Sequence, residues 1–434
     1  MDCAMTLVLT SMFRLPSVVR FTDIAMSHLL DGLTSIVLVP RTIPMGQFGQ
    51  ELRSRFILRG IDFLEIDISR FAATAPVTCF CQELGIKWRD PLAPRILAHL
   101  PEACDFPEIL PEVVWLTGFE ETAPQTAQAW IDAAFVWSGN SKVLRDRGIR
   151  VPAVCVTMPW KAELRIPRSD IFFKVFHWWG IPSVLEMRLL CQNETSVENE
   201  FEIWQEYLVP RLCVGDPLLM PALLETRSLE EREIGPILQE IAIGRGWRKE
   251  SLDSLGIEET FSLNDTKLNR MPELSGQVLS LWGEGVLNWT PDNGLSISSA
   301  ALQIIGKHVA IKHRMWRGQS ELVLPMIDAL RLRVCDYMAG KHGCDWPIAH
   351  VEPKDLQESV AVRQTHYNCQ LGHMETVLAS WPSRQPVMRE TAACIRGLRP
   401  LRNDLAHNRV MTFSKYQDLC ERIDRVLNLL NRSS

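Results

Sequence analysis

Short apolar runs alternate with helix-like segments along the first third of the chain. Four such runs (TSIVLVP, IDFLEIDI, VVWLT and VPAVCVT) begin at residues 34, 61, 113 and 151, and the apolar residues of the segment 123–137 recur at helical spacing. Runs of this length, separated by helices, are typical of strands in a parallel sheet that helices cover. We therefore expect an α/β domain with a helix-covered parallel sheet over residues 1–160.

The pattern becomes helical and richer in aromatic residues after this domain. HWWGIPSVLEMRLL and FEIWQEYLVPRL have the composition of buried helices, and core packing is the simplest explanation of their aromatic residues. Residues 281–297 (LWGEGVLNWTPDNGLSI) place a Pro-Asp-Asn-Gly turn between two apolar runs, which predicts a hairpin. We expect a mostly helical connector or second domain over residues 161–299.

Long amphipathic segments dominate the last third. Their apolar positions recur at helical spacing, and Gly340, Pro382 and Pro400 mark the expected ends. Four antiparallel helices of this kind form a bundle, so we expect an all-α helical bundle over residues 300–434. Three parts are consistent with a chain of 434 residues. The helices are expected over residues 312–338, 355–381, 385 or 389 to 397, and 416–430.

Charge is distributed unevenly along the chain. The net charge is −6, but the residues from 301 onward hold 19 Lys and Arg against 13 Asp and Glu, and seven of the ten His. The basic last third is therefore the part expected to contact phosphate, and the acidic remainder is expected to have other partners.

The cysteines and the N-terminal residues bear on the cellular compartment. Twelve cysteines include no CxxC pair, which is typical of a reducing cytoplasm. No Lys or Arg precedes Arg14, so a signal peptide is not expected, and no apolar run approaches the length of a membrane helix. We expect a cytoplasmic protein without membrane association.

The RNDLAH motif, residues 402–407, holds the strongest chemical signal. Cleavage of RNA without a metal needs proton transfer at the 2′-hydroxyl and at the leaving 5′-oxygen, and a cation over the phosphate. An imidazole exchanges protons near neutral pH, which suits the proton transfer expected of His407, and Arg402 can donate to phosphate bidentately. The Asn403 amide can orient either group. The alternative is that Arg402 and Asn403 cap a helix and that His407 is an ordinary surface residue.

The spacing within the motif bears on oligomeric state. Five residues along a helix rotate by about 500°, which leaves Arg402 and His407 roughly 140° apart around the axis. A second copy facing the first would bring these groups together more easily. We therefore expect a symmetric homodimer with the site at its seam.

The motif and its helical surroundings resemble the HEPN superfamily. Its ribonuclease members carry an Arg, a polar residue and a His four to six positions after the Arg, near the end of an all-α bundle; the similar region here is residues 300–434. The resemblance implies a dimeric, metal-independent ribonuclease with Arg402 and His407 as catalytic pair and Asn403 as supporting residue. HEPN domains also occur as non-catalytic nucleotide-binding or protein-assembly modules, which is the alternative.

Two further groups could contribute to an RNA-binding surface. His366, Cys369 and His373 are expected on one helix face, where they could line an RNA groove, bind zinc or simply pack. An arginine series surrounds the motif, and it would attract phosphate unless its members are ordinary solvated side chains. The RNA-binding residues expected from these two groups are Arg396, Arg399, Arg409, His366 and His373.

The N-terminal domain is similar in layout to P-loop ATPases of the AAA+ and STAND type. In those proteins acidic residues after an apolar strand hold magnesium, and Glu120 and Glu121 would correspond to them. No GxxxxGK[ST] occurs, and the loop after the first expected strand, PRTIPMGQFGQEL, has no Lys. We therefore expect a Rossmann-like or degenerate NTPase-like domain that regulates or scaffolds; sensing of a nucleotide second messenger is a variant of this hypothesis.

These observations together predict an endoribonuclease that acts as a toxin or defence effector. It would need no metal and no cofactor and would leave 2′,3′-cyclic phosphate and 5′-hydroxyl ends. RNA is the expected substrate, the N-terminal domain the expected regulator, and a partner protein or antitoxin is possible.

Overall fold

The computed structural model divides the chain into two compact units. It describes residues 10–71, 76–90, 103–149, 151–179, 182–194, 199–214, 216–258, 274–290, 294–381 and 386–433. Unit 1 consists of Met1–Leu190, Cys213–Pro221 and Ile241–Ile305, and unit 2 of Cys191–Leu212, Ala222–Glu240 and Gly306–Ser434. The predicted connector over residues 161–299 is therefore not a separate domain, because its segments are shared between the two units.

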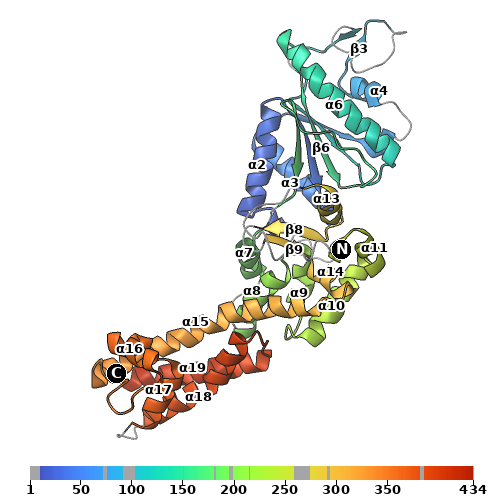
Figure 1. The fold of residues 1–434 in the computed structure, drawn as a ribbon. Coiled ribbons are helices and arrows are strands. Elements are labelled where there is room, and N and C mark those ends of the chain that lie inside the picture. The colour runs from blue at the N-terminus through green and yellow to red at the C-terminus, as the bar shows by residue number, and fades with distance from the viewer. Residues whose placement is uncertain are drawn as a thin grey trace. The chain divides into compact units, whose positions relative to one another are not determined.

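Unit 1 is built on a five-stranded sheet in the order β2-β5-β6-β1-β7, in which all neighbours are parallel. Figure 1 shows this sheet, with β6 labelled, between α2 (Pro16–Leu30) and α6 (Pro124–Asp146). The predicted parallel α/β fold is confirmed. The sequence does not predict the edge strand β7, because its aromatic residues fall where the pattern becomes helical. In the structure its backbone pairs with β1. The strands are β1 (Thr34–Val39), β2 (Phe63–Asp67), β5 (Val113–Thr117), β6 (Ala153–Pro159) and β7 (Phe173–His177).

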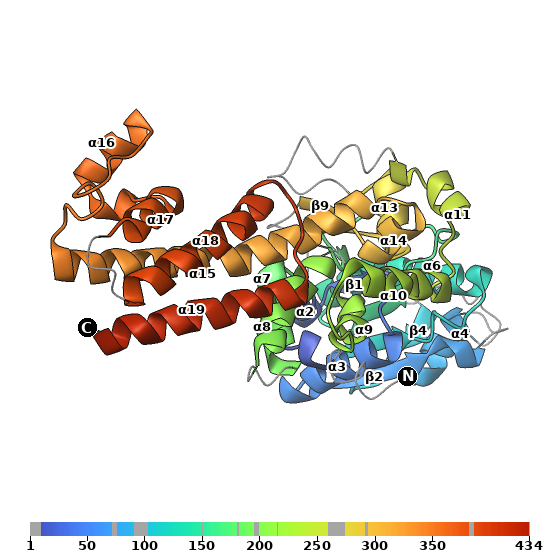
Figure 2. The same cartoon turned by 90° about the horizontal axis from the view of Figure 1, so that it is seen from below.

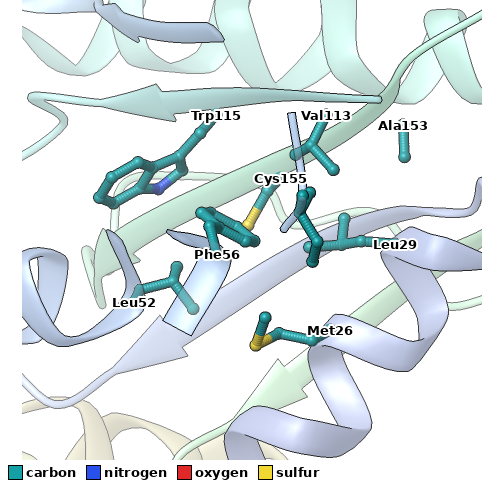
Figure 3. Close-up of a cluster of buried hydrophobic side chains, with 9 residues drawn as sticks. Met26, Leu29, Leu52, Phe56, Val113, Trp115, Ala153 and Cys155 are labelled. Carbon is teal, nitrogen blue, oxygen red and sulfur yellow. The ribbon is translucent and has the colours of Figure 1, made fainter. Parts of the chain in front are cut away.

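Helices cover both faces of this sheet. On one face α2 (Pro16–Leu30) and α3 (Met45–Leu58) pack Met26, Leu29 and Phe56 against strand residues such as Trp115 and Cys155 (Figure 3). Successive side chains of a strand point to opposite faces of the sheet. The strand residues that alternate with Trp115 and Cys155 therefore face the other side, and they are buried too. The other face is covered by α6 (Pro124–Asp146), which contacts β1 and β6.

The rest of unit 1 contains short elements. The expected hairpin is confirmed as the antiparallel pair β8 and β9, although residues 281–283 belong to a helix and the turn at 291–293 lies outside the described residues. The elements here and at the unit boundaries are α4 (Pro76–Glu83), β3 (Lys87–Trp88), β4 (Cys104–Asp105), α7 (Val184–Glu194), α9 (Met220–Leu224), α10 (Glu231–Gly244), α11 (Lys249–Ser254), α13 (Gly276–Gly283), β8 (Leu287–Thr290), β9 (Gly294–Ile297) and α14 (Ser299–Ile304).

Glu186 joins the starts of two helices in unit 1. Its carboxylate accepts hydrogen bonds from Ser183 N (2.9 Å), beside the start of α7, and from Ser17 N (2.6 Å), in the first turn of α2, while Ser183 Oγ accepts from Glu186 N (3.2 Å). The Ser183–Glu186 pair is a capping box. Burial acts to raise the pKa of Glu186, but the hydrogen bonds from Ser183 and Ser17 outweigh it, and the pKa is lowered.

The lowered pKa of Glu186 predicts acid sensitivity. A carboxylate with a depressed folded pKa stabilises the fold above its ordinary pKa, and the contribution is lost as the pH falls through the folded value. We expect Glu186→Gln to lower the free energy of unfolding by about 1–2 kcal/mol at pH 7 and to differ little from the wild type at low pH. Denaturant unfolding at several pH values measures this, and a pH-independent difference would contradict it.

Unit 2 is a helical bundle, as expected. Figure 2 shows α15, α18 and α19 running alongside one another, and α17 packs on α18. At one end of the bundle Trp204 of α8 stacks on Tyr416 of α19 at 4.9 Å between ring centroids. The helices are α8 (Glu200–Leu212), α15 (His308–His342), α16 (Leu356–Gln364), α17 (Leu371–Ala379), α18 (Pro386–Ala406) and α19 (Phe413–Ser433).

Two helix predictions for unit 2 are wrong. The expected helix over residues 355–381 is divided, because Thr365 adopts an extended backbone and its hydroxyl accepts from Tyr367 N, which starts a 3₁₀ turn, His366–Asn368. The expected break at Pro400 is absent, and α18 continues through this residue to Ala406.

No helix within the described part of the chain combines the length and the apolar character that crossing a bilayer requires.

Candidate functional site

A crevice in unit 1 lies where β2 and β5 end. It has a volume of about 400 Å³ and is lined by the first turns of α3, including Gly46 and Gly49, and by Trp115. Glu120 and Glu121, the acidic residues predicted to follow an apolar strand, line it and are exposed. The carboxyl edge of a parallel sheet is a common place for ligand sites.

The carboxylates at the end of β2 are already engaged by the protein. Glu65 forms an ion pair with Arg53, and Asp67 Oδ1 accepts from Ser69 N (3.1 Å) and Ser69 Oγ (2.6 Å). Gly118 follows β5 with φ +81°, and a Cβ there would lie 2.2 Å from Asp67 Oδ1, so this position requires glycine. The Thr117 hydroxyl of β5 donates to Glu65 Oε1 at 3.4 Å, which links the ends of β2 and β5.

The loop between β1 and α3 does not fit a nucleotide phosphate. Pro40 and Pro44 have no N–H, Arg41 N donates to Gly283 O (2.8 Å), and Ile43 N donates to Pro40 O (3.0 Å). A phosphate-binding loop needs several unengaged N–H groups and a lysine. The two prolines and these two hydrogen bonds reduce the number of N–H groups that this loop can offer to a phosphate, and the loop has no lysine.

A lysine after β6 is also engaged. Lys161 Nζ donates to three carbonyls of the loop that follows β5, those of Phe119 (2.7 Å), Glu120 (3.3 Å) and Thr122 (3.0 Å). This ammonium group ties the loops after β5 and β6 together.

The RNDLAH motif of unit 2 lies at the end of α18. Arg402 and Asn403 occupy its last two turns, His407 follows it directly, and all three side chains are exposed. Arg402 Nη1 donates to Asn403 Oδ1 at 3.4 Å. His407 N donates to Asn403 O at 3.0 Å, and Asn408 has φ +59°, the left-handed conformation in which asparagine often ends helices. The motif thus presents a guanidinium, an amide and an imidazole on the surface.

Helix α15 holds the turn that carries His407. Trp316 Nε1 donates to Leu405 O at 2.6 Å. One turn further along α15, the fully buried Gln319 donates from Nε2 to Met411 O (2.9 Å) and accepts from Met411 N (2.8 Å). The backbone is therefore fixed on both sides of His407. The sequence alone predicts no role for Trp316 or Gln319. The feature of the sequence that could have indicated one is a glutamine, Gln319, at a helix position whose neighbours on the same face are apolar.

The arginines near the motif differ in their partners. Arg396 Nε and Arg399 Nη1 donate to the two carboxylate oxygens of Glu375 at 2.8 and 2.6 Å, and these hydrogen bonds lower the pKa of Glu375. Arg409 Nη1 lies 3.2 Å from Asp404 Oδ1. Among these arginines and Arg402, only Arg402 has no acidic partner within the described residues. Arg402 is thus the best placed of them to receive a phosphate.

The prediction that His366, Cys369 and His373 share one helix face is wrong, because α16 ends at Gln364 and the chain is extended at Thr365. His366 lies in the 3₁₀ turn with its ring against Tyr367 (4.1 Å between centroids), and burial raises the pKa of the Cys369 thiol. His373 is buried in α17, with Nε2 2.7 Å from Pro347 O.

The buried position of His373 leaves no surface for RNA, so its predicted RNA-binding role is dropped. Among the residues that the structure describes, no three His, Cys, Asp or Glu side chains are grouped to hold a metal ion.

Comparison with known proteins adds little. The sequence matches no protein-family model and no curated protein. Among solved structures, Cdc6p from Pyrobaculum aerophilum is similar over 71% of this chain and 96% of its own chain, with 14% sequence identity and a TM-score of 0.30. Function must therefore be inferred from the residues of this chain.

Proposed function

We propose that the chain is a metal-independent endoribonuclease whose reaction site is formed by Arg402, Asn403 and His407. The observation that carries the proposal is the exposed cluster at the end of α18, in which Arg402 has no acidic partner within the described residues and His407 lies on a turn fixed by α15. The resemblance to HEPN ribonucleases depends on these residues and on the helical bundle.

The cluster supplies groups that RNA transesterification requires. The 2′-oxygen attacks phosphorus and the bond to the 5′-oxygen breaks, which leaves a 2′,3′-cyclic phosphate and a 5′-hydroxyl. His407 transfers a proton in this step, because imidazole exchanges protons near neutral pH. The Arg402 guanidinium binds the non-bridging oxygens, where negative charge builds up. Asn403 Oδ1 accepts a hydrogen bond from Arg402 and orients it.

The remaining roles follow from this proposal. RNA is the substrate, and two copies associate through unit 2 so that their motifs face each other. Unit 1, with its acidic crevice and without a phosphate cradle, regulates the nuclease and binds a partner protein or antitoxin in the cell. The biological role is that of a toxin or defence effector.

Cleavage of RNA in EDTA by the purified full chain tests the proposed activity. We expect the wild type to leave 2′,3′-cyclic phosphate ends and His407→Ala to be at least about a hundredfold slower. His350→Ala is the matched control, since His350 is another exposed histidine of unit 2. Equal cleavage by wild type and His407→Ala would show that the site is wrong, and a wild type without cleavage would favour a non-catalytic module.

A further inference from the structure

The proposed reaction moves two protons, whereas the motif has one histidine. One group must take the proton of the 2′-hydroxyl, and another must give a proton to the leaving 5′-oxygen. A guanidinium group does not give up a proton in proteins and an amide does not titrate, so neither Arg402 nor Asn403 supplies the second group. Asp404, the remaining ionisable side chain of the motif, pairs with Arg409. A second proton-transfer group must therefore come either from another part of the chain or from the motif of the second copy.

His313 of α15 is placed to be this group. Its ring packs on Trp316 with 5.0 Å between centroids and 33° between planes. The same indole donates from Nε1 to Leu405 O (2.6 Å), two residues before His407. The His313 ring and the turn that carries His407 therefore both contact the side chain of Trp316. His313 is also exposed, so its ring is accessible to an RNA substrate.

The surroundings of His313 favour the neutral imidazole. Partial burial lowers the pKa of His313, and the charges of Arg317 and Arg314 on the same helix lower it further. A neutral imidazole at neutral pH is able to accept a proton, which is the property of a general base.

We propose that His313 is the general base of the ribonuclease site and that His407 is the general acid. His313 takes the proton of the ribose 2′-hydroxyl while the bond from the 2′-oxygen to phosphorus forms. The bond from phosphorus to the 5′-oxygen breaks, and His407 gives its proton to that oxygen. The inference rests on the proposed function. In a dimer the competing base is the His407 of the second copy.

Two substrates with different leaving groups distinguish the base from the acid. In an RNA oligonucleotide the 5′-oxygen must be protonated as it leaves, whereas the nitrophenolate of uridine 3′-(4-nitrophenyl phosphate) leaves without a proton. We expect His313→Ala to slow cleavage of both substrates at least about a hundredfold. For His407→Ala we expect a loss on the ester at least about tenfold smaller than the loss on RNA.

Controls separate the base role from structural support of Trp316. His313→Gln retains much of the side-chain volume, and we expect it to unfold like the wild type while losing as much activity as His313→Ala. Added imidazole is expected to restore part of the activity of His313→Ala.

The outcomes separate this inference from the proposed function. If His313→Ala cleaves both substrates like the wild type, or if His407→Ala loses both equally, His313 is not the base and the nuclease assignment stands. If the wild type cleaves neither substrate, the proposed function fails and the inference fails with it.

Discussion

Arg402→Ala is expected to lower kcat/KM for RNA about a thousandfold, at the upper end of what removal of one group that stabilises a developing anion costs. Arg402 is exposed, hydrogen-bonds to Asn403 and has no acidic partner within the described residues, so its charge is available to the phosphate. Arg402→Lys keeps the charge but loses the planar pair of donors, and we expect it to recover only part of the activity. Cleavage of a labelled RNA in EDTA measures both effects.

Arg396→Ala is the matched control for this experiment. Arg396 is an exposed arginine of the same helix, but its charge is engaged by Glu375. We expect a loss of activity of less than about threefold. An exposed ion pair contributes little free energy, and the guanidinium of Arg396 is already engaged by Glu375 instead of by the phosphate. If Arg396→Ala and Arg402→Ala lost activity equally, α18 would attract RNA only through its overall charge, and the catalytic role of Arg402 would be contradicted.

Asp216→Ala is expected to lower the free energy of unfolding of unit 1 by about 3–5 kcal/mol, the usual cost of removing one partner from a buried ion pair. Asp216 is buried, forms an ion pair with Arg245 and accepts from Ser298 Oγ at 2.6 Å. Without the carboxylate, the half-buried guanidinium and the buried hydroxyl lose their partner. These bonds also join two of the three chain segments of unit 1.

Denaturant unfolding of the full chain, followed by tryptophan fluorescence, measures this loss. Asp105→Ala is the control, since Asp105 pairs with Arg89 on the surface and its removal is expected to cost less than about 1 kcal/mol. Equal stability of the Asp216 and Asp105 variants would mean that the buried pair does not hold unit 1 together. Pairing Asp216→Asn with Arg245→Met should recover part of the loss, because the double variant leaves no buried charge without a partner.

The parallel sheet could be predicted from the sequence because its central strands are buried on both faces. β1 and β6 have mostly apolar sequences, and every residue of each is buried. β7 could not be predicted in the same way, since only Phe173 in it is buried and its backbone pairs along one side only. The unit boundaries were not predictable either, because a chain that passes between the units several times leaves no single change in composition.

For the candidate site, too, some features follow from the sequence and others only from the tertiary structure. The sequence by itself determined the chemical groups of the RNDLAH motif and the helical nature of its surroundings, because residue type and apolar spacing are local properties. Only the tertiary structure decided which arginines are paired with Glu375, that His373 is buried, and that Trp316 and Gln319 hold the turn of His407. The physical reason is distance along the chain: Gln319 and Met411 are 92 positions apart, and packing of the bundle, not local sequence, brings their polar groups into contact.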